Sequence, residues 1–290
     1  MADPVPAVTE AAATGEIAAI FADIRAVYRV GVVNLIWRHL ATIDGALPWA
    51  WGALRPAYVD GSAGAAADVL RARLALPALP AIPPEVLASA GLDDAAVAGV
   101  RRVLAAYDRT NAMALVALSS LQRRLQGADA TGPATRIDPA VHGISPPSEA
   151  APPAPAALSS PQEEEIALPP LPDLAALAPD TARLVLALNR WGTTSATPIL
   201  ASMYRHLAPW PPYLALAWAL LAPLAEDGRL DAAIAGVQAQ AAAADLPLRA
   251  APPPDPLRGH IAAALAPFTG EVIAKMVAIC AMLRRATGPG

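Results

Sequence analysis

The feature that most constrains the fold is an internal duplication. The segment Trp37–Ala41 is repeated as Tyr204–Ala208, and the two copies stay in register without a gap as far as Asp60–Gly61 and Asp227–Gly228. Along that register both copies carry a tryptophan, a proline and an Asp–Gly pair at matching positions. A duplication of this length predicts two similar units, each with one apolar face that is buried against the other.

The duplication divides the chain into three parts. We expect a first helical repeat over residues 1–126, a linker over residues 127–172 and a second helical repeat over residues 173–290. The middle part is dense in proline, alanine and serine and includes the acidic run Glu163–Glu165. Such a composition is typical of a linker, because it packs no core of its own.

The composition predicts that both repeats are helical. Hydrophobic residues make up 55% of the 290 residues, and many of them are alanine and leucine, which are strong helix formers. Runs of β-branched and aromatic residues, which mark strands, are nearly absent. We therefore predict an all-α fold of two tandem multi-helix repeats, related by a pseudo-two-fold axis as in a dimer. The interface between the repeats is the expected place for a pocket.

Local signals place some of the helices. Thr14 precedes apolar residues at helical spacing and is a candidate N-cap. A long helix is expected from about Asp93 to Leu125, and the two Asp–Gly pairs predict turns between helices.

Several classes of function and location are disfavoured. With 21 basic and 25 acidic residues the net charge is −4 and no basic stripe stands out, so nucleic acid is not an expected partner. The N-terminus lacks the pattern of a secretory signal, which favours a cytoplasmic protein. The most apolar segment, residues 206–225, contains four prolines and is expected to be a buried helix rather than a membrane span. The single cysteine, Cys280, is expected to be a small core residue. No cofactor motif is present.

The duplication also sorts the polar residues. Arg38 and Arg205 match each other, as do His39 and His206. Because residues kept in both copies serve what the copies share, we expect structural, hydrogen-bonded roles for these four. An alternative is that the two histidines face each other and bind a metal, although no further cluster of ligands accompanies them.

Polar residues in only one copy are freer to serve a site. Asn34 aligns with Ala201, and Asn111 aligns with Val272. An asparagine on an apolar helix face costs free energy unless something pairs with it. Two alternatives remain open: each side chain bonds a neighbouring backbone carbonyl, or the two orient a small polar ligand between the repeats.

Several local motifs occur together in each copy. The first copy contains Ile20–Arg25, Val33–Arg38 and Ala50–Trp51, and the second contains Ser202–Arg205, Trp210–Pro211 and Ala217–Trp218. In this combination the chain resembles the group I 2-haloacid dehalogenases over nearly its whole length. The resemblance implies a helical pseudo-dimer, often a homodimer, with a pocket between the repeats. It also implies hydrolysis of both enantiomers of a short 2-haloacid by water that an aspartate activates directly.

The resemblance breaks at the position of that aspartate. The family's second-repeat pattern Ser-Asp-Tyr-Arg is here Ser202–Met203–Tyr204–Arg205, and methionine cannot accept a proton from water. The nearest acids on the helices that follow, Asp108 and Glu271, are explained by helix solubility and the helix dipole. The candidate contacts of a substrate are five residues: Asn34, Trp37, Asn111, Ser202 and Tyr204.

Three hypotheses follow. The chain is a dehalogenase-type hydrolase with a relocated base, a non-catalytic binder of a small organic acid, or a helical oligomerisation scaffold. The asparagines present in only one copy favour a ligand, and Met203 favours binding over dehalogenation. No cofactor is expected, and the expected partners are a small organic acid between the repeats and a second copy of the chain.

Overall fold

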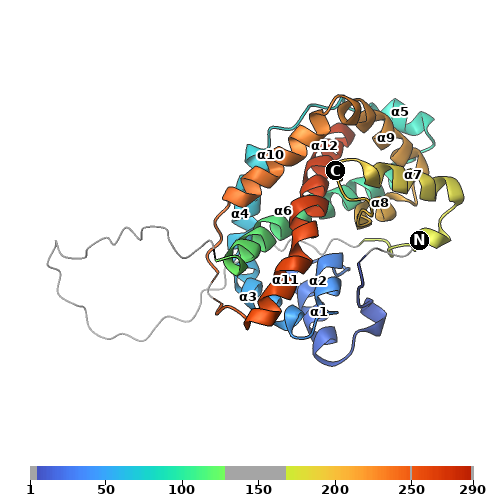
Figure 1. The fold of residues 1–290 in the computed structure, drawn as a ribbon. Coiled ribbons are helices and arrows are strands. Elements are labelled where there is room, and N and C mark those ends of the chain that lie inside the picture. The colour runs from blue at the N-terminus through green and yellow to red at the C-terminus, as the bar shows by residue number, and fades with distance from the viewer. Residues whose placement is uncertain (1–4, 128–167, 249, 289–290) are drawn as a thin grey trace, which may run out of the picture.

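The computed structural model describes residues 5–127, 168–248 and 250–288, and most of these residues lie in helices (Figure 1). The first half contains α1 (Gly15–Tyr28), α2 (Leu35–Leu40), α3 (Ala46–Val59), α4 (Ser62–Arg73), α5 (Pro84–Ser89) and α6 (Asp94–Leu125). The second half contains α7 (Pro179–Arg190), α8 (Ser202–Leu207), α9 (Pro211–Glu226), α10 (Arg229–Ala243), α11 (Asp255–Pro267) and α12 (Ile273–Thr287). Short 3₁₀ turns, Glu10–Ala12 and Leu174–Ala176, precede α1 and α7, and a π-helical turn, Phe268–Val272, joins α11 to α12. The predicted all-α class is confirmed.

Some aligned segments of the two halves have the same local structure. The aligned segments Leu35–Leu40 and Ser202–Leu207 are both six-residue helices. The Asp–Gly pairs lie between consecutive helices as predicted, with Gly61 at φ 82° and Gly228 at φ 79°. This left-handed conformation favours glycine, because a Cβ atom would be strained there. That a pseudo-two-fold axis relates the halves stays a prediction, as do the boundaries of the repeats.

Helices α6 and α12 form the centre of the molecule, where they make the most extensive contact between elements (Figure 1). Leu104 and Leu115 from α6 and Ile279 and Leu283 from α12 are fully buried. Each such side chain contributes about 1.5–3 kcal/mol when it leaves water. Cys280 is also buried, as expected, and its thiol donates to the Leu104 carbonyl at 3.2 Å.

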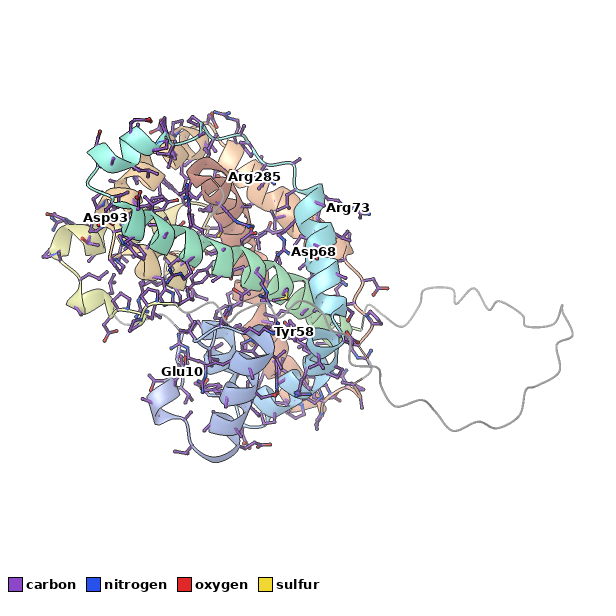
Figure 2. All side chains as sticks on the ribbon, turned by 180° about the vertical axis from the view of Figure 1, so that it is seen from behind. Glu10, Tyr58, Asp68, Arg73, Asp93 and Arg285 are labelled. Atoms are coloured by element: carbon purple, nitrogen blue, oxygen red, sulfur yellow. The ribbon has the colours of Figure 1, made fainter. Side chains whose placement is uncertain are left out.

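The ends of the helices follow the local signals in part. Asp93 caps α6 by accepting a hydrogen bond from the Ala96 amide at 2.8 Å (Figure 2), and the predicted helix from about Asp93 to Leu125 is confirmed. Thr14 occupies the N-cap of α1 in extended backbone, but its side chain makes no capping hydrogen bond. The predicted linker falls mostly outside the described residues.

One helical stretch has the length and composition to cross a membrane, and it is not the segment that the sequence singled out. In the part of the chain that the structure describes, this stretch is Asp255–Thr287, and 78% of its most apolar window is buried inside the molecule. Burial of this kind is typical of a core helix. Residues 206–225 instead form the end of α8, a short turn and most of α9.

Candidate functional site

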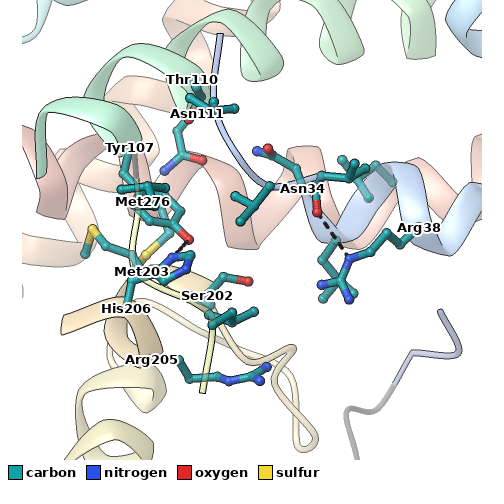
Figure 3. A pocket seen from close by; sticks show the side chains of 18 of the residues that line it. Asn34, Arg38, Tyr107, Thr110, Asn111, Ser202, Met203, Arg205, His206 and Met276 are labelled. Carbon is teal, nitrogen blue, oxygen red and sulfur yellow. Dashed lines mark hydrogen bonds between the residues drawn. The ribbon is translucent and has the colours of Figure 1, made fainter. Parts of the chain in front are cut away.

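A cavity of about 390 Å³ lies between elements of both halves (Figure 3). The first half contributes the turn at Glu10, the segment before α2, α2 itself and the middle of α6. The second half contributes α8, the π-helical turn and the start of α12, and residues 168–173, which span the end of the predicted linker, complete the lining. The sequence analysis predicted a pocket between the repeats, and residues from both predicted repeats line this cavity.

Three of the five candidate contacts line this cavity: Asn34, Asn111 and Ser202. Met203 lines it as well, although its side chain is fully buried. Trp37 and Tyr204 are also fully buried, but they are not among the lining residues. Trp37 instead packs edge to face against Trp51, with ring centroids 5.4 Å apart. Helical periodicity explains the difference, because neighbouring residues on α2 and α8 point to different sides.

Asn111 presents a buried donor to the cavity. It is 6% exposed, and its Nδ2 has no hydrogen-bond partner within the described residues. The alternative in which this amide nitrogen bonds a neighbouring carbonyl therefore finds no support. Asn34 occupies the N-cap of α2 without a capping side-chain bond and is half-buried. Most buried polar groups in proteins are paired, so an unpaired donor on a cavity needs an explanation.

A row of three polar side chains joins the two halves beside the cavity. The Tyr107 hydroxyl from α6 lies 2.7 Å from Nδ1 of His206 on α8 (Figure 3). Burial raises the pKa of Tyr107, and a hydrogen bond from Ser202 acts in the opposite direction. Burial lowers the pKa of His206 to about 4, and the charge of Arg205 adds to this, whereas the Pro169 carbonyl raises it. His206 is therefore neutral at pH 7.

The two matched histidines do not face each other. Nδ1 of His39 lies 2.8 Å from the Pro6 carbonyl oxygen, and its ring stacks on Phe268. Nε2 of His206 is buried and has no hydrogen-bond partner of ordinary geometry in the described structure. No group of three or more His, Cys, Asp or Glu side chains that could hold a metal occurs among the described residues. The alternative of a shared metal site therefore finds no support.

The two matched arginines both line the cavity. Nε of Arg38 donates to the Val33 carbonyl at 3.2 Å, and Nε of Arg205 donates to the Pro172 carbonyl at 2.8 Å. These bonds fit the predicted structural role, but both guanidinium groups also bring positive charge to the cavity. The rule that residues kept in both copies are structural missed this charge. Matched residues from the two halves can line the same cavity when that cavity lies between the halves.

The carboxylates on the described part of the lining are Glu10 and Asp173. Glu10 pairs with Arg25 and accepts a hydrogen bond from the Val33 amide at 2.9 Å. The Asp173 side chain is 90% exposed and lies 3.7 Å from Arg205. Sequence reasoning missed both, because they lie in short turns before α1 and α7, outside the motifs.

The explanation of Asp108 by helix solubility is wrong, and Glu271 has specific hydrogen-bond partners. Asp108 is buried and forms an ion pair with Arg284 at 2.6 Å. Glu271 binds the loop between α7 and α8, where it accepts from the Thr193 hydroxyl and from the Thr194 and Ser195 amides at 3.1 and 3.3 Å. The hydrogen bonds of that loop lower the pKa of Glu271 against the effect of burial, which is the largest single influence and acts to raise it. Neither acid lines the cavity.

The same loop is held at its other end by Asn189. The Asn189 side chain donates to the Ile199 carbonyl at 3.1 Å and accepts from the Ala201 amide at 3.0 Å, directly before α8. Lys275, fully buried on α12, donates to the Asn189 carbonyl at 2.6 Å. Burial lowers the pKa of Lys275 to about 8, while Glu271 raises it. These bonds fix the position of the start of α8, where Ser202 and Met203 lie.

Comparison with solved structures covers almost the whole chain. A D-2-haloacid dehalogenase mutant superposes with a TM-score of 0.74 over 99% of this chain and 97% of that one, at 18% identity. The chain has the fold of the D-2-haloacid dehalogenases. A mutant of such a dehalogenase in complex with D-2-CPA (19% identity) and a complex with L-LA (18% identity) both give a TM-score of 0.72, over 99% of this chain and 97% of theirs.

Sequence comparison also finds a 2-haloacid dehalogenase, over a shorter span. A configuration-inverting 2-haloacid dehalogenase of Alcaligenes xylosoxydans xylosoxydans is 37% identical over 123 residues. The match spans 42% of this chain and 41% of that protein, less than half of either. No family model matches the chain. The resemblance to 2-haloacid dehalogenases is thus supported, and assignment to group I stays a prediction.

Proposed function

We propose that the cavity binds a short carboxylic acid, as a dehalogenase-type site that lacks the water-activating aspartate. The observation that carries the proposal is the unpaired Nδ2 of Asn111, a buried donor on the cavity. A ligand oxygen would satisfy it. Arg38 and Arg205 supply the positive charge that a carboxylate requires, and guanidinium groups are well suited to that task. Apolar residues such as Leu35 and Ile273 complete the lining.

Met203 argues against the chemistry that the resemblance implies. Displacement of halide by water needs a group that accepts a proton as the C–O bond forms, and such a base contributes about 10²–10⁴ in rate. The methionine thioether cannot do so. We therefore place binding ahead of dehalogenation. A second candidate is slow dehalogenation with Glu10 as the base, which its place on the lining favours and its pairing with Arg25 opposes.

The test combines binding with halide release. Thermal shift of the full chain is measured with propionate, pyruvate and both enantiomers of 2-chloropropionate, since a ligand of the folded state raises the unfolding temperature. Halide release is measured for the native chain, Met203→Asp and Glu10→Gln. We expect a saturable shift with at least one acid and halide release only from Met203→Asp.

Each other result has a definite meaning. Release by the native chain that Glu10→Gln abolishes would establish the second candidate. Absence of any shift at millimolar concentration would overturn the proposal and favour the oligomerisation scaffold. Asn111→Leu should reduce the largest of these shifts, and its matched control is His39→Gln, because His39 lies outside the cavity lining. Formation of a homodimer and a cytoplasmic location stay predictions, which gel filtration and cell fractionation would test.

A further inference from the structure

The cavity lining contains two buried side-chain nitrogens that make no hydrogen bond of ordinary geometry with the described residues, one from each half of the molecule. Nδ2 of Asn111 on α6 and Nε2 of His206 on α8 are both buried and unpaired, and both residues line the cavity. Figure 3 shows them on the same side of the cavity, around Tyr107 and Met203. Leaving a buried donor unsatisfied costs about 1–3 kcal/mol. Two such groups at one place indicate a ligand that accepts from both.

The hydrogen bond between Tyr107 and His206 determines whether Nε2 of His206 is a donor or an acceptor. The Tyr107 hydroxyl lies 2.7 Å from Nδ1 of His206, and a neutral tyrosine has a hydroxyl hydrogen that it can donate to an imidazole nitrogen. When Nδ1 of a neutral imidazole accepts, Nε2 carries the hydrogen and is a donor. The Pro169 carbonyl is near enough to influence His206, but it makes no hydrogen bond of ordinary geometry with Nε2. The site thus offers two neutral N–H groups.

A ligand hydroxyl group at this point would need an acceptor for its own hydrogen in addition to the two donors. A 2-hydroxy acid must donate its own O–H, and the side chain beside these donors, Met203, is a weak acceptor. A carbon-bound halogen accepts hydrogen bonds poorly and would leave both N–H groups unsatisfied. A carbonyl oxygen has two lone pairs and no hydrogen, so it accepts from both donors and needs nothing in return.

We propose that the acid bound here is a 2-oxo acid, whose 2-carbonyl oxygen accepts from Nδ2 of Asn111 and Nε2 of His206. This rests on the proposed function and names its ligand class. The carboxylate lies toward the guanidinium groups of Arg38 and Arg205. Entry of the carbonyl oxygen requires a shift of the buried side chains beside His206. Met203 and Met276, which both line the cavity, are unbranched and adapt readily.

Isothermal titration of the full chain with pyruvate, propionate, lactate and 2-chloropropionate tests the proposal. Pyruvate should bind at least about tenfold more tightly than each of the others, because sites built for a hydrogen-bonded group discriminate strongly against analogues that lack it. Asn111→Leu and His206→Leu should each bring the pyruvate-to-propionate ratio close to one. Propionate affinity should change less than roughly threefold, since propionate has no 2-oxygen.

Tyr107→Phe is a milder variant that keeps the ring and removes only the hydroxyl that orients His206. It should lower the affinity ratio while the variant stays folded, which circular dichroism would check. If propionate, 2-chloropropionate and pyruvate bind equally well, the 2-oxo proposal is wrong while the acid-binding function stands. If no acid binds, both are wrong. An unchanged ratio in folded His206→Leu or Tyr107→Phe would remove His206 from the site.

Discussion

Helices α2 and α8 carry the same Arg–His–Leu triplet at aligned positions, yet their histidines have different surroundings. His39 on α2 is partly exposed, with Nδ1 near the Pro6 carbonyl and its ring on Phe268. His206 on α8 is fully buried beside the cavity and meets Tyr107 from the other half. The residue at the position of Tyr107 in the second half is Phe268, which has no hydroxyl. The matched histidines therefore have different surroundings, because the aromatic residue beside them is a tyrosine in one case and a phenylalanine in the other.

The aligned tryptophans differ in the same way. Trp51 is 4% exposed, donates from Nε1 to Asp23 at 2.7 Å and packs among Tyr28, Trp37 and Tyr58. Trp218 is 43% exposed and stacks only on Trp191 among the aromatic rings of the described structure. The difference teaches that a duplication preserves positions in the chain more faithfully than it preserves contacts.

The largest expected effect therefore separates the two tryptophans. Trp51→Ala should lower the free energy of unfolding by about 3–5 kcal/mol, because it opens a cavity and leaves Asp23 with one donor fewer. Trp218→Ala should cost about 1 kcal/mol, since much of its surface is already in water. Denaturant unfolding followed by circular dichroism measures both. Equal losses would show that the two sites are equivalent after all.

The next effect separates the two histidines by pH. The folded-state pKa of His206 is about 4 and its ordinary value is 6.5. As the pH falls below 6.5, the unfolded chain binds the proton first, so stability is full above pH 6.5 and declines toward pH 4. The loss is on the order of 2–3 kcal/mol.

Comparison of variants isolates this contribution. Unfolding should be measured from pH 7 to pH 4.5, above the range in which the carboxyl groups with lowered pKa, such as Asp23, take up protons. His206→Gln should flatten the decline, and the matched variant His39→Gln should leave it in place. The same slope in all three proteins would mean that His206 is not held neutral by burial.

Much of the fold could be predicted from the sequence, and less of the site. Helical composition, the Asp–Gly turns and the cap at Asp93 act through neighbouring residues, so local patterns report them. Asn34 and Asn111 could be identified as candidates because each lacks a polar counterpart in the other copy. The positions of Glu10 and of the unpaired nitrogen of His206 on the cavity depend on which helices pack together. No local sequence pattern indicates that packing, and His206 was assigned a structural role because both copies carry a histidine at its position.

The two loops that lead into α2 and α8 are held by different groups. Glu10 binds the Val33 amide before α2 and is partly exposed. Asn189 makes two buried hydrogen bonds before α8. Asn189→Leu should cost about 2 kcal/mol, because the Ile199 carbonyl and the Ala201 amide lose their partner inside the protein. Glu10→Gln should cost less than about 1 kcal/mol, as expected for a partly exposed pair. Chemical denaturation of the two variants distinguishes these losses.

The smallest expected effect concerns the starts of α6 and α11. Asp93 caps α6 through its carboxylate at 2.8 Å from the Ala96 amide, whereas Pro254 precedes α11 without a side-chain bond. Asp93→Ala should lower the free energy of unfolding by about 1 kcal/mol, the usual loss for a cap whose acceptor is removed. Asp93→Asn, which keeps an acceptor oxygen, should recover most of that loss, and Pro254→Ala should cost less than Asp93→Ala. If Asp93→Asn were as unstable as Asp93→Ala, the negative charge at the start of α6 rather than the hydrogen bond would account for the stabilisation.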